Sequence, residues 1–512
     1  MRIFEAGLQK LPAFCAVRED VRAGRLPTAV TGLGHIHKVL WIHALHTALN
    51  RRTVLLVADE AEATRMQEDL TALGENVLLL PARELSLRQL ESASREYEQQ
   101  RLGTLANMAE GRYDCVIAGL DAAVQYTLPP ETLLSRTLDI VAGAPLPVPD
   151  IAAALIAAGY ERAAQIEGAG QFAIRGGIVD IYPAAATQPI RVELWGDTVD
   201  TIAYFDLLSQ RRTETLDAVS IPPAAEIMYD DAAGLAEKLT ALCARLRGKN
   251  AALQKENLQK DIDRLQSGSL PTSLDKYIPL IYEKPATFFD YCRDSLVFVS
   301  EIGRVRERAR TFHWQLQEDI KGLIGEGVLC HALTEFAMPS DTLHLRLEQM
   351  GAVLMQTFAG SLWDISARTL YNVTARQLPV WSGGVELLAD DLQDMLHRGV
   401  ACVVLSGKEE KAAAVLAEDL TARFVWNDFC GANLSKYIIE ETRKSEGRVL
   451  VFLKPCDTYS FNQLIKEHRV DREKAYIIGV GCKGTLKPEK IRDAGIKGIK
   501  SVTIDGDTLK FE

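Results

Sequence analysis

Residues 170–183 read GQFAIRGGIVDIYP, and residues 190–197 read IRVELWGD. The first stretch consists of two β-prone runs interrupted by the pair Gly176-Gly177, and the second is a β-prone run that ends at the pair Gly196-Asp197, with another β-prone run after it; both pairs favour a tight turn. This pattern predicts short antiparallel strands joined by hairpins.

The second stretch presents two unlike faces. Successive side chains of a strand point in opposite directions, so Ile190, Val192 and Leu194 share one face while Arg191 and Trp195 share the other. The first is an ordinary buried face. The second carries an arginine and a large aromatic, the residue types enriched at binding hot spots. The alternative is a sheet buried on both sides, with the tryptophan packed under a neighbouring helix.

The order of these motifs resembles a known module. GQFAIRGGIVDIYP, IRVELWGD, YFD (residues 204–206) and SQR (residues 209–211) resemble the UvrB-homology module of the bacterial transcription-repair coupling factor family. The damage-recognition protein UvrB has a looser version. The resemblance implies that Arg175, Arg191 and Trp195 bind UvrA, although the family more often has Phe at the tryptophan position. Arginines on such a face would pair with carboxylates of an acidic partner.

The composition indicates a globular protein of roughly three or four domains. The 512 residues are 47% hydrophobic and 25% charged, with a formal net charge of −11, so any DNA contact requires a local basic patch. Nine cysteines are scattered singly, which suits reduced thiols. The sequence shows no signal peptide and no run of about 18 apolar residues. We therefore expect a cytoplasmic protein that does not span a membrane.

Residues 26–140 alternate between β-prone and helical segments. The apolar run from Thr53 to Ala58 suits a strand buried on both faces of a parallel sheet, and further strands are expected at 77–80 and 115–118. Such alternation predicts an α/β fold with a doubly wound sheet. With the resemblance, the expected fold is a degenerate helicase-like (RecA-like) parallel sheet domain, an inserted antiparallel β-rich module, a small third α/β domain and a short α/β tail.

A loop between the first strand and the first helix of this layer occupies the position of a phosphate-binding loop. A P-loop needs Gly-Lys-Ser/Thr at its end, so that the lysine reaches the outer phosphates and the hydroxyl holds magnesium. Here Gly32 and Gly34 are followed by His35 and Ile36. Histidine has a shorter reach and no reliable charge at neutral pH, and isoleucine cannot bind a metal. The loop is therefore expected to be a degenerate nucleotide site.

The acidic half of such a site is also altered. The apolar strand Leu296–Ser300 is followed by Glu301, and the resemblance to UvrB places an aspartate where this chain has Ser300. Magnesium coordination requires a carboxylate there. Both halves of the site are changed, which agrees with the degenerate helicase domain of the family. We expect no ATP hydrolysis and no cofactor, with ATP bound only by the motor of longer family members.

The composition also changes along the chain. Residues 1–423 contain 11 Lys and 31 Arg, whereas residues 424–512 contain 11 Lys and 5 Arg. We predict a boundary there. The expected domains are residues 1–144 together with 227–329, the inserted UvrA-binding module at 145–226, a small domain at 330–423 and an unrelated tail at 424–512.

The tail resembles a second family. KPCD (residues 454–457) and IIGVGC (residues 477–482) are similar to motifs of the deazaflavin-reducing hydrogenase/dehydrogenase beta-subunit family. Thiolates of Cys456 and Cys482 could ligate an iron–sulfur cluster if two strands place them together. Buried or unused thiols are favoured over cluster ligands, because the cysteine run expected downstream is absent. The change of composition at its start suggests either a gene fusion or an assembly artefact.

The leading hypothesis is a binding module that recruits UvrA in transcription-coupled nucleotide excision repair, and not an enzyme. By the resemblance, contacts with DNA and RNA polymerase belong to downstream domains that we expect this chain to lack. The alternative is a flavin or iron–sulfur redox subunit, based on the tail.

Overall fold

The computed structural model describes residues 7–374, except residues 86, 88–95, 185, 270 and 272. Beyond residue 374 it describes residues 397–398, 438–439, 442, 449–453, 455–467, 469–479, 502–505 and 508–511. Contacts divide the chain into two compact units, Met1–Gln377 and Leu378–Glu512. Among the described residues, every helix is too short or too polar to span a membrane.

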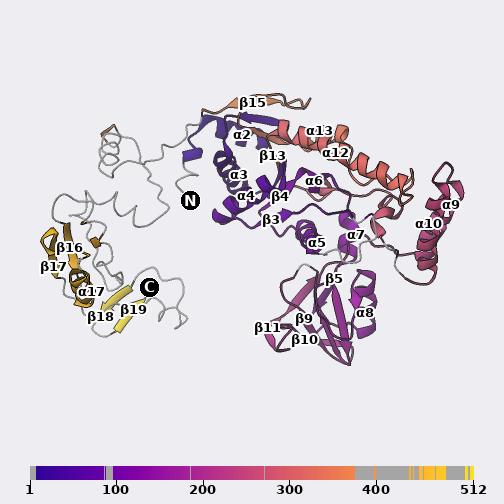
Figure 1. The fold of residues 1–512 in the computed structure, drawn as a ribbon, viewed down its shortest axis with the longest axis horizontal. Helices are drawn as coiled ribbons and strands as arrows, with labels where there is room; N and C mark the ends of the chain where they lie inside the picture. The colour runs from indigo at the N-terminus through magenta and orange to yellow at the C-terminus, as the bar shows by residue number, and fades with distance from the viewer. Residues whose placement is uncertain are drawn as a thin grey trace. The chain divides into compact units, whose positions relative to one another are not determined.

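A seven-stranded parallel sheet forms the centre of the first unit, with the strand order β15-β1-β14-β13-β2-β4-β3 (Figure 1). In chain order its strands are β1 (Thr28–Thr31), β2 (Thr53–Val57), β3 (Val77–Leu80), β4 (Cys115–Gly119), β13 (Leu296–Ser300), β14 (Val353–Gln356) and β15 (Thr369–Asn372). Every residue of β2, β4 and β13 is buried. The predicted continuous apolar strands are therefore confirmed, and the sheet is covered on both faces.

Helices form the layers on either side of this sheet (Figure 1). Along β2, Leu55 and Val57 belong to one hydrophobic core, and Val54 and Leu56 belong to the other. The first core is completed by α2 (Pro12–Arg22), α3 (His35–Leu49) and α4 (Glu60–Ala72). The second is completed by α5 (Glu96–Glu110), α6 (Leu120–Val124), α12 (Ile302–Gly325) and α13 (Ser340–Gln349).

The shorter segments of the first unit pack in the second core or in a third core. They are α7 (Pro130–Ser135), η1 (Leu274–Tyr277), α11 (Ile278–Ile281) and η2 (Phe288–Asp290). Two further helices, α9 (Ala232–Arg245) and α10 (Ala251–Gln266), pack on each other. Leu258, Ile262 and Leu265 of α10 are buried in a core shared with the end of α12, while most of the charged residues of α10 are exposed.

The structure corrects the prediction that a third domain begins at residue 330. Strand β14 pairs with β1 and β13, and β15 pairs with the other edge of β1, all in parallel. Helix α13 leads into β14 and packs in the second core. Residues 340–372 therefore complete the first sheet. The strands are only four residues long each, so their pattern did not reveal which sheet they join.

The inserted module is built on a six-stranded sheet with the order β11-β10-β9-β8-β7-β6. All neighbours are antiparallel except β6 and β7. The strands are β6 (Glu161–Arg162), β7 (Gln171–Arg175), β8 (Ile178–Ile181), β9 (Ile190–Trp195), β10 (Thr198–Phe205) and β11 (Arg212–Leu216). One face packs on α8 (Val148–Ala157) and on a separate pair formed by β5 (Leu138–Val141) and β12 (Ala218–Ile221).

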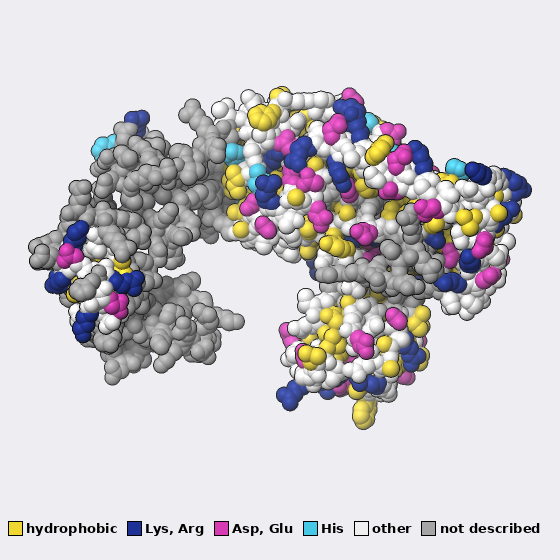
Figure 2. All heavy atoms as spheres, in the orientation of Figure 1, with side chains coloured by type: hydrophobic (Ala, Val, Ile, Leu, Met, Phe, Trp, Pro, Cys, Tyr) yellow, Lys and Arg dark blue, Asp and Glu magenta, His cyan; other side chains and the backbone are white. Residues whose placement is uncertain are grey.

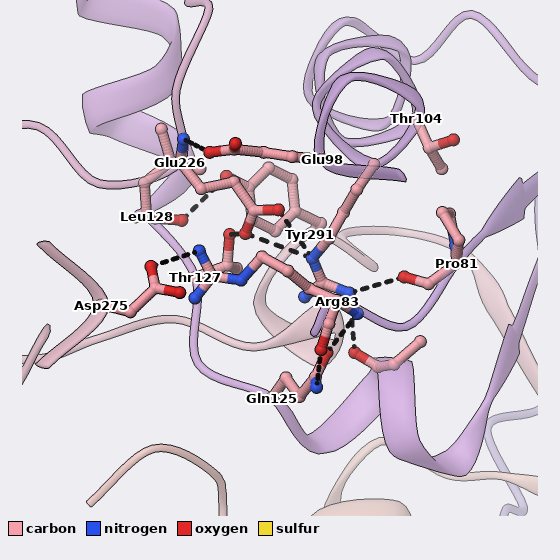
Figure 3. A network of polar contacts seen from close by, with 12 residues as sticks. Pro81, Arg83, Glu98, Thr104, Gln125, Thr127, Leu128, Glu226, Asp275 and Tyr291 are labelled. Atoms are coloured by element: carbon pink, nitrogen blue, oxygen red, sulfur yellow. Dashed lines mark hydrogen bonds and ion pairs between the residues drawn. The ribbon is translucent and has the colours of Figure 1, made fainter. Parts of the chain in front are cut away.

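A buried polar network joins this module to the parallel-sheet layer (Figure 3). Glu226, which follows β12, is fully buried and forms an ion pair with Arg101 of α5, in which Nε lies 2.9 Å from Oε1 and donates a hydrogen bond to Oε2 at 3.2 Å. Thr127 Oγ1 donates to the same carboxylate at 2.6 Å. Burial alone would raise the pKa of Glu226, but Arg101 and Arg83 lower it below its ordinary value. The carboxylate is therefore ionised, and it ties the end of the module to helix α5.

The second unit is described in part. Strands β16 (Val449–Leu453) and β17 (Ala475–Gly479) form a parallel pair, with α17 (Pro455–Lys466) and η4 (Arg472–Lys474) between them in the chain. Strands β18 (Val502–Asp505) and β19 (Thr508–Phe511) form an antiparallel hairpin. Between residues 375 and 437, which include the rest of the small domain expected at 330–423, the structure describes only residues 397–398.

Candidate functional site: the outer face of the module sheet

The face of the six-stranded sheet opposite α8 carries the residues singled out in the sequence. On β9, Ile190 and Val192 are buried in the module core, whereas the exposed fraction of Trp195 is 86%. The predicted alternation along this strand is therefore confirmed. The register places Asp180 of β8 opposite Arg191, on the outer face.

Asp180 lies between two guanidinium groups. Its carboxylate is 2.6 Å from Nε of Arg191 and 2.5 Å from Nη2 of Arg175, and its side chain is almost fully buried. The hydrogen bonds from Arg191 Nε and Nη2 to the two carboxylate oxygens are bidentate, and bonding to Asp180 raises the pKa of Arg191 above its ordinary value. Both arginines are thus held in place by the module itself.

The two arginines differ in exposure. The Arg191 side chain is 12% exposed, lies over the Phe205 ring at 4.3 Å, and donates to the Gln210 side chain at 2.8 Å. The Arg175 side chain is 47% exposed. Ile166 also packs on this half of the face with Phe205. The half of the outer face near Arg191 is therefore covered by loops.

The other half lies at the hairpin turns and is open. Gly176 and Gly196 both have φ of +62°, which allows the β7–β8 and β9–β10 turns to be tight. A β-carbon at Gly177 would lie 2.8 Å from the Leu194 carbonyl oxygen, so the two turns are in close contact. This contact places Trp195 and Arg175 at the same end of the sheet.

Charged and apolar groups mix on the open half. Arg212 of β11 pairs with Glu193 of β9 at 2.7 Å, and Ile178 is partly exposed between Arg175 and Glu193. Figure 2 shows hydrophobic and basic side chains projecting from the surface of this module. An exposed aromatic beside guanidinium groups is a suitable surface for an acidic protein partner.

The loop predicted to be a degenerate nucleotide site is occupied by the chain's own groups. Gly32 has φ of +87°, and a β-carbon there would overlap the Val373 carbonyl oxygen. The amide of Leu33 donates to the Gln356 carbonyl at 3.0 Å, and the amide of Gly34 donates to His37 Nδ1 at 3.2 Å. These amides are therefore engaged in internal hydrogen bonds, and the loop does not fit a phosphate.

The remaining candidate residues of that loop point to other partners. His35 Nε2 is 2.7 Å from the Asp69 carboxylate, and Ile36 is 50% exposed. Ser300 and Glu301 lie close to helix α3, as expected for two halves of one site, but a residue that the sequence analysis did not single out joins them. Lys38 Nζ is 3.0 Å from Ser300 Oγ and 2.5 Å from Glu301 Oε1.

The ammonium group of Lys38 supplies, at Glu301, the positive charge that a bound cation would supply in a nucleotide site. Thr357 donates to Glu301 through both its amide and its hydroxyl, and Ser300 donates to Glu62 at 2.7 Å. Burial would raise the pKa of Glu301, but the hydrogen bonds from Lys38 and Thr357 lower it. Lys38 follows Gly34 by one helical turn, a spacing that could have indicated that its ammonium reaches the same strand end.

The weak metal candidates Cys456 and Cys482 lie outside the residues whose side chains are described. Their proposed approach at a sheet edge therefore stays a prediction.

Comparisons with known proteins bear on the module directly. The family model of the UvrB interaction domain matches residues 138–227. The transcription-repair-coupling factor of Bacillus subtilis (strain 168) is 30% identical over 420 residues, which cover 79% of this chain and 35% of that protein. The protein of the same name from Staphylococcus aureus (strain MRSA252) is 22% identical over 409 residues, which cover 77% of this chain and 34% of that protein.

The chain thus spans about a third of the length of the curated relatives it matches. The expected resemblance to the coupling factors is confirmed for the UvrB-homologous part. Neither of these two relatives supports the redox interpretation of the tail.

Proposed function

Because residues 138–227 form a UvrB interaction domain in a chain similar to transcription-repair coupling factors, we propose that this chain recruits UvrA in transcription-coupled repair. It acts as a protein-binding module through the open half of its outer sheet face. The observation that carries the proposal is Trp195, 86% exposed at the same sheet end as Arg175.

The physical basis is an anchor with a charged surround. A tryptophan that is exposed in the free protein loses a large apolar surface to water on docking, which is typical of a hot spot. Arg175 and Arg212 provide guanidinium groups that can reach partner carboxylates. Arg191 is mostly buried, so its contribution is to hold Asp180 and the strand register, with a smaller direct contact.

The experiment is a calorimetric titration of the full chain with purified UvrA. We expect saturable one-site binding that weakens as salt increases, because charged pairs at the rim are screened. An acidic protein of unrelated fold serves as the control and should not bind. The proposal fails if UvrA gives no saturable signal, or if the control protein binds as well.

We also propose that residues 1–377 do not hydrolyse ATP. The loop amides of Leu33 and Gly34 are bonded internally, and Lys38 is bonded to Glu301 where a magnesium–phosphate group would need both. Phosphate release by the full chain should equal that of buffer. Turnover that disappears in a His35→Ala variant would contradict this account.

A further inference from the structure

A cluster of ionisable side chains lies at the N-terminal ends of the parallel strands, the end opposite to that of Ser300 and Glu301. His46 is in the last turn of α3, Glu75 is in the loop between α4 and β3, and Asp114 directly precedes β4. One ligand atom from each lies within 4.8 Å of the others. The Glu75 side chain is 6% exposed, and that of His46 is 19% exposed.

The hydrogen bonding of His46 fixes which nitrogen faces the carboxylates. Its Nδ1 is 2.8 Å from the Arg51 carbonyl oxygen, which only accepts, so Nδ1 carries a hydrogen. In the neutral ring Nε2 therefore presents a lone pair. That atom faces Glu75 Oε2 at 3.3 Å and Asp114 Oδ1 at 3.7 Å. With the neutral ring, a lone pair and two carboxylate oxygens thus lie within 4.8 Å of one another, an arrangement that a cation between them would stabilise.

The distances favour a metal ion over a proton. A charge-assisted hydrogen bond from an imidazolium would be about 2.7–2.9 Å long, shorter than either contact of Nε2. Ligands on a tetrahedral ion with bonds of about 2.0–2.1 Å are about 3.3–3.4 Å apart. The separation between His46 Nε2 and Glu75 Oε2 matches that value at 3.3 Å.

The remaining atoms of the three side chains are already held. Glu75 Oε1 is 2.5 Å from His43 Nδ1, and Asp114 Oδ2 accepts from the Asn76 amide at 2.8 Å. Outer hydrogen bonds of this kind orient ligands and raise metal affinity. His46 is also at the C-terminal end of α3, where the helix dipole favours a cation. The ligand atoms are thus preorganised from three separate segments.

We propose that His46, Glu75 and Asp114 bind a divalent transition-metal ion, Zn²⁺ in preference to the harder Mg²⁺. One imidazole and two carboxylates suit zinc, with a fourth position open to water beside Asp114, whose side chain is 41% exposed. The ion clamps the end of α3 to the loop before β3 and to the start of β4. The site is independent of the UvrA-binding surface.

The test is a cobalt titration of the chelator-treated full chain, followed by absorption spectroscopy. Co²⁺ bound by nitrogen and oxygen gives visible bands without the near-ultraviolet charge-transfer band of thiolate ligands, so binding to cysteines is recognised. We expect one Co²⁺ per chain, displaced by Zn²⁺. His46→Ala should weaken binding at least about 10-fold. His43→Ala should weaken it less. The exposed His331 provides the matched control, and His331→Ala should bind normally.

A second measurement guards against misfolding of the variants. Zn²⁺ should raise the melting temperature of the unaltered chain and of His331→Ala, but not that of His46→Ala or Asp114→Asn. Should His46→Ala not fold, Asp114→Asn decides, because its partly exposed side chain can be changed conservatively. The proposal is overturned if Co²⁺ does not bind saturably, if His46→Ala and Asp114→Asn bind it as tightly as the unaltered chain, or if the spectrum shows a thiolate band.

Discussion

Asp180 fixes the position of the Arg191 side chain through two hydrogen bonds. The sequence places Arg191 on the face opposite Ile190 and Val192, and the structure confirms this placement. The sequence did not reveal the buried carboxylate opposite it, because the partner comes from another strand and depends on register. With Asp180 only 2% exposed and bonded to Arg175 and Arg191, those arginines are part of the fold as well as of the surface.

Reversing the charge of Arg191 should therefore destabilise the module. Arg191→Glu places a carboxylate beside buried Asp180 and removes its bidentate partner, and breaking a buried pair costs about 3–5 kcal/mol. We expect a loss of about 2–4 kcal/mol, because Arg175 remains and Arg191 is partly exposed. Urea unfolding followed by far-ultraviolet circular dichroism measures it.

Arg212→Ala is the control for this prediction. Its ion pair with Glu193 is on the same sheet face, but the Arg212 side chain is 50% exposed. The expected loss is below about 1 kcal/mol. Equal stability losses in the two variants, or an Arg191→Glu variant as stable as the parent, would show that the Asp180 pairs do not support the fold.

At the scale of elements, hydrophobic periodicity and turn residues were sufficient to predict the strands that are long or continuously apolar. The β9–β10 hairpin followed from alternation and the Gly196-Asp197 turn, and β2 and β13 followed from apolar runs. Strands β14 and β15 were placed in the wrong domain. Their pairing with β1 joins residues more than three hundred positions apart, and a local pattern carries no information on such pairing.

The junction between the module and the parallel sheet depends on Glu226. Glu226→Gln should lower the free energy of unfolding by about 3–5 kcal/mol, because Arg101 would remain buried without a negative partner. The pKa of Glu226 is lowered in the folded state, so this stabilisation is present at neutral pH and is lost as the pH falls through the lowered pKa. The difference between parent and variant should therefore shrink toward acid pH.

Glu256→Gln provides the comparison for that experiment. Glu256 pairs with Lys260 on the surface of α10, where both side chains are more than 60% exposed. Urea unfolding should hardly distinguish this variant from the parent. A Glu226→Gln variant whose stability loss is small, or is the same at every pH, would contradict the role given to the buried carboxylate.

At the scale of the whole molecule, composition and contacts divide the chain at different places. The change from arginine to lysine suggested residue 423, whereas contacts separate Gln377 from Leu378. Composition records the amino-acid usage of a stretch, and contacts record which residues pack together, so the two need not coincide. The first unit contains both the parallel sheet and the residues that match the family model of the UvrB interaction domain, and the central claim concerns this unit.

That claim is that the open half of the module face binds UvrA through Trp195. The most direct measurement is the affinity for UvrA of three full-length proteins: the parent, Trp195→Ala and Trp314→Ala. Trp314 is 63% exposed on α12, outside the module, and so is a matched control for loss of a surface tryptophan.

We expect Trp195→Ala to weaken binding by about 2 kcal/mol, or about 30-fold, as for the loss of a hot-spot anchor. Trp314→Ala should bind like the parent. Both variants should keep the parent's melting temperature, because neither side chain is buried. Unchanged affinity in Trp195→Ala, or an equal loss in Trp314→Ala, would contradict the claim that this face is where UvrA docks.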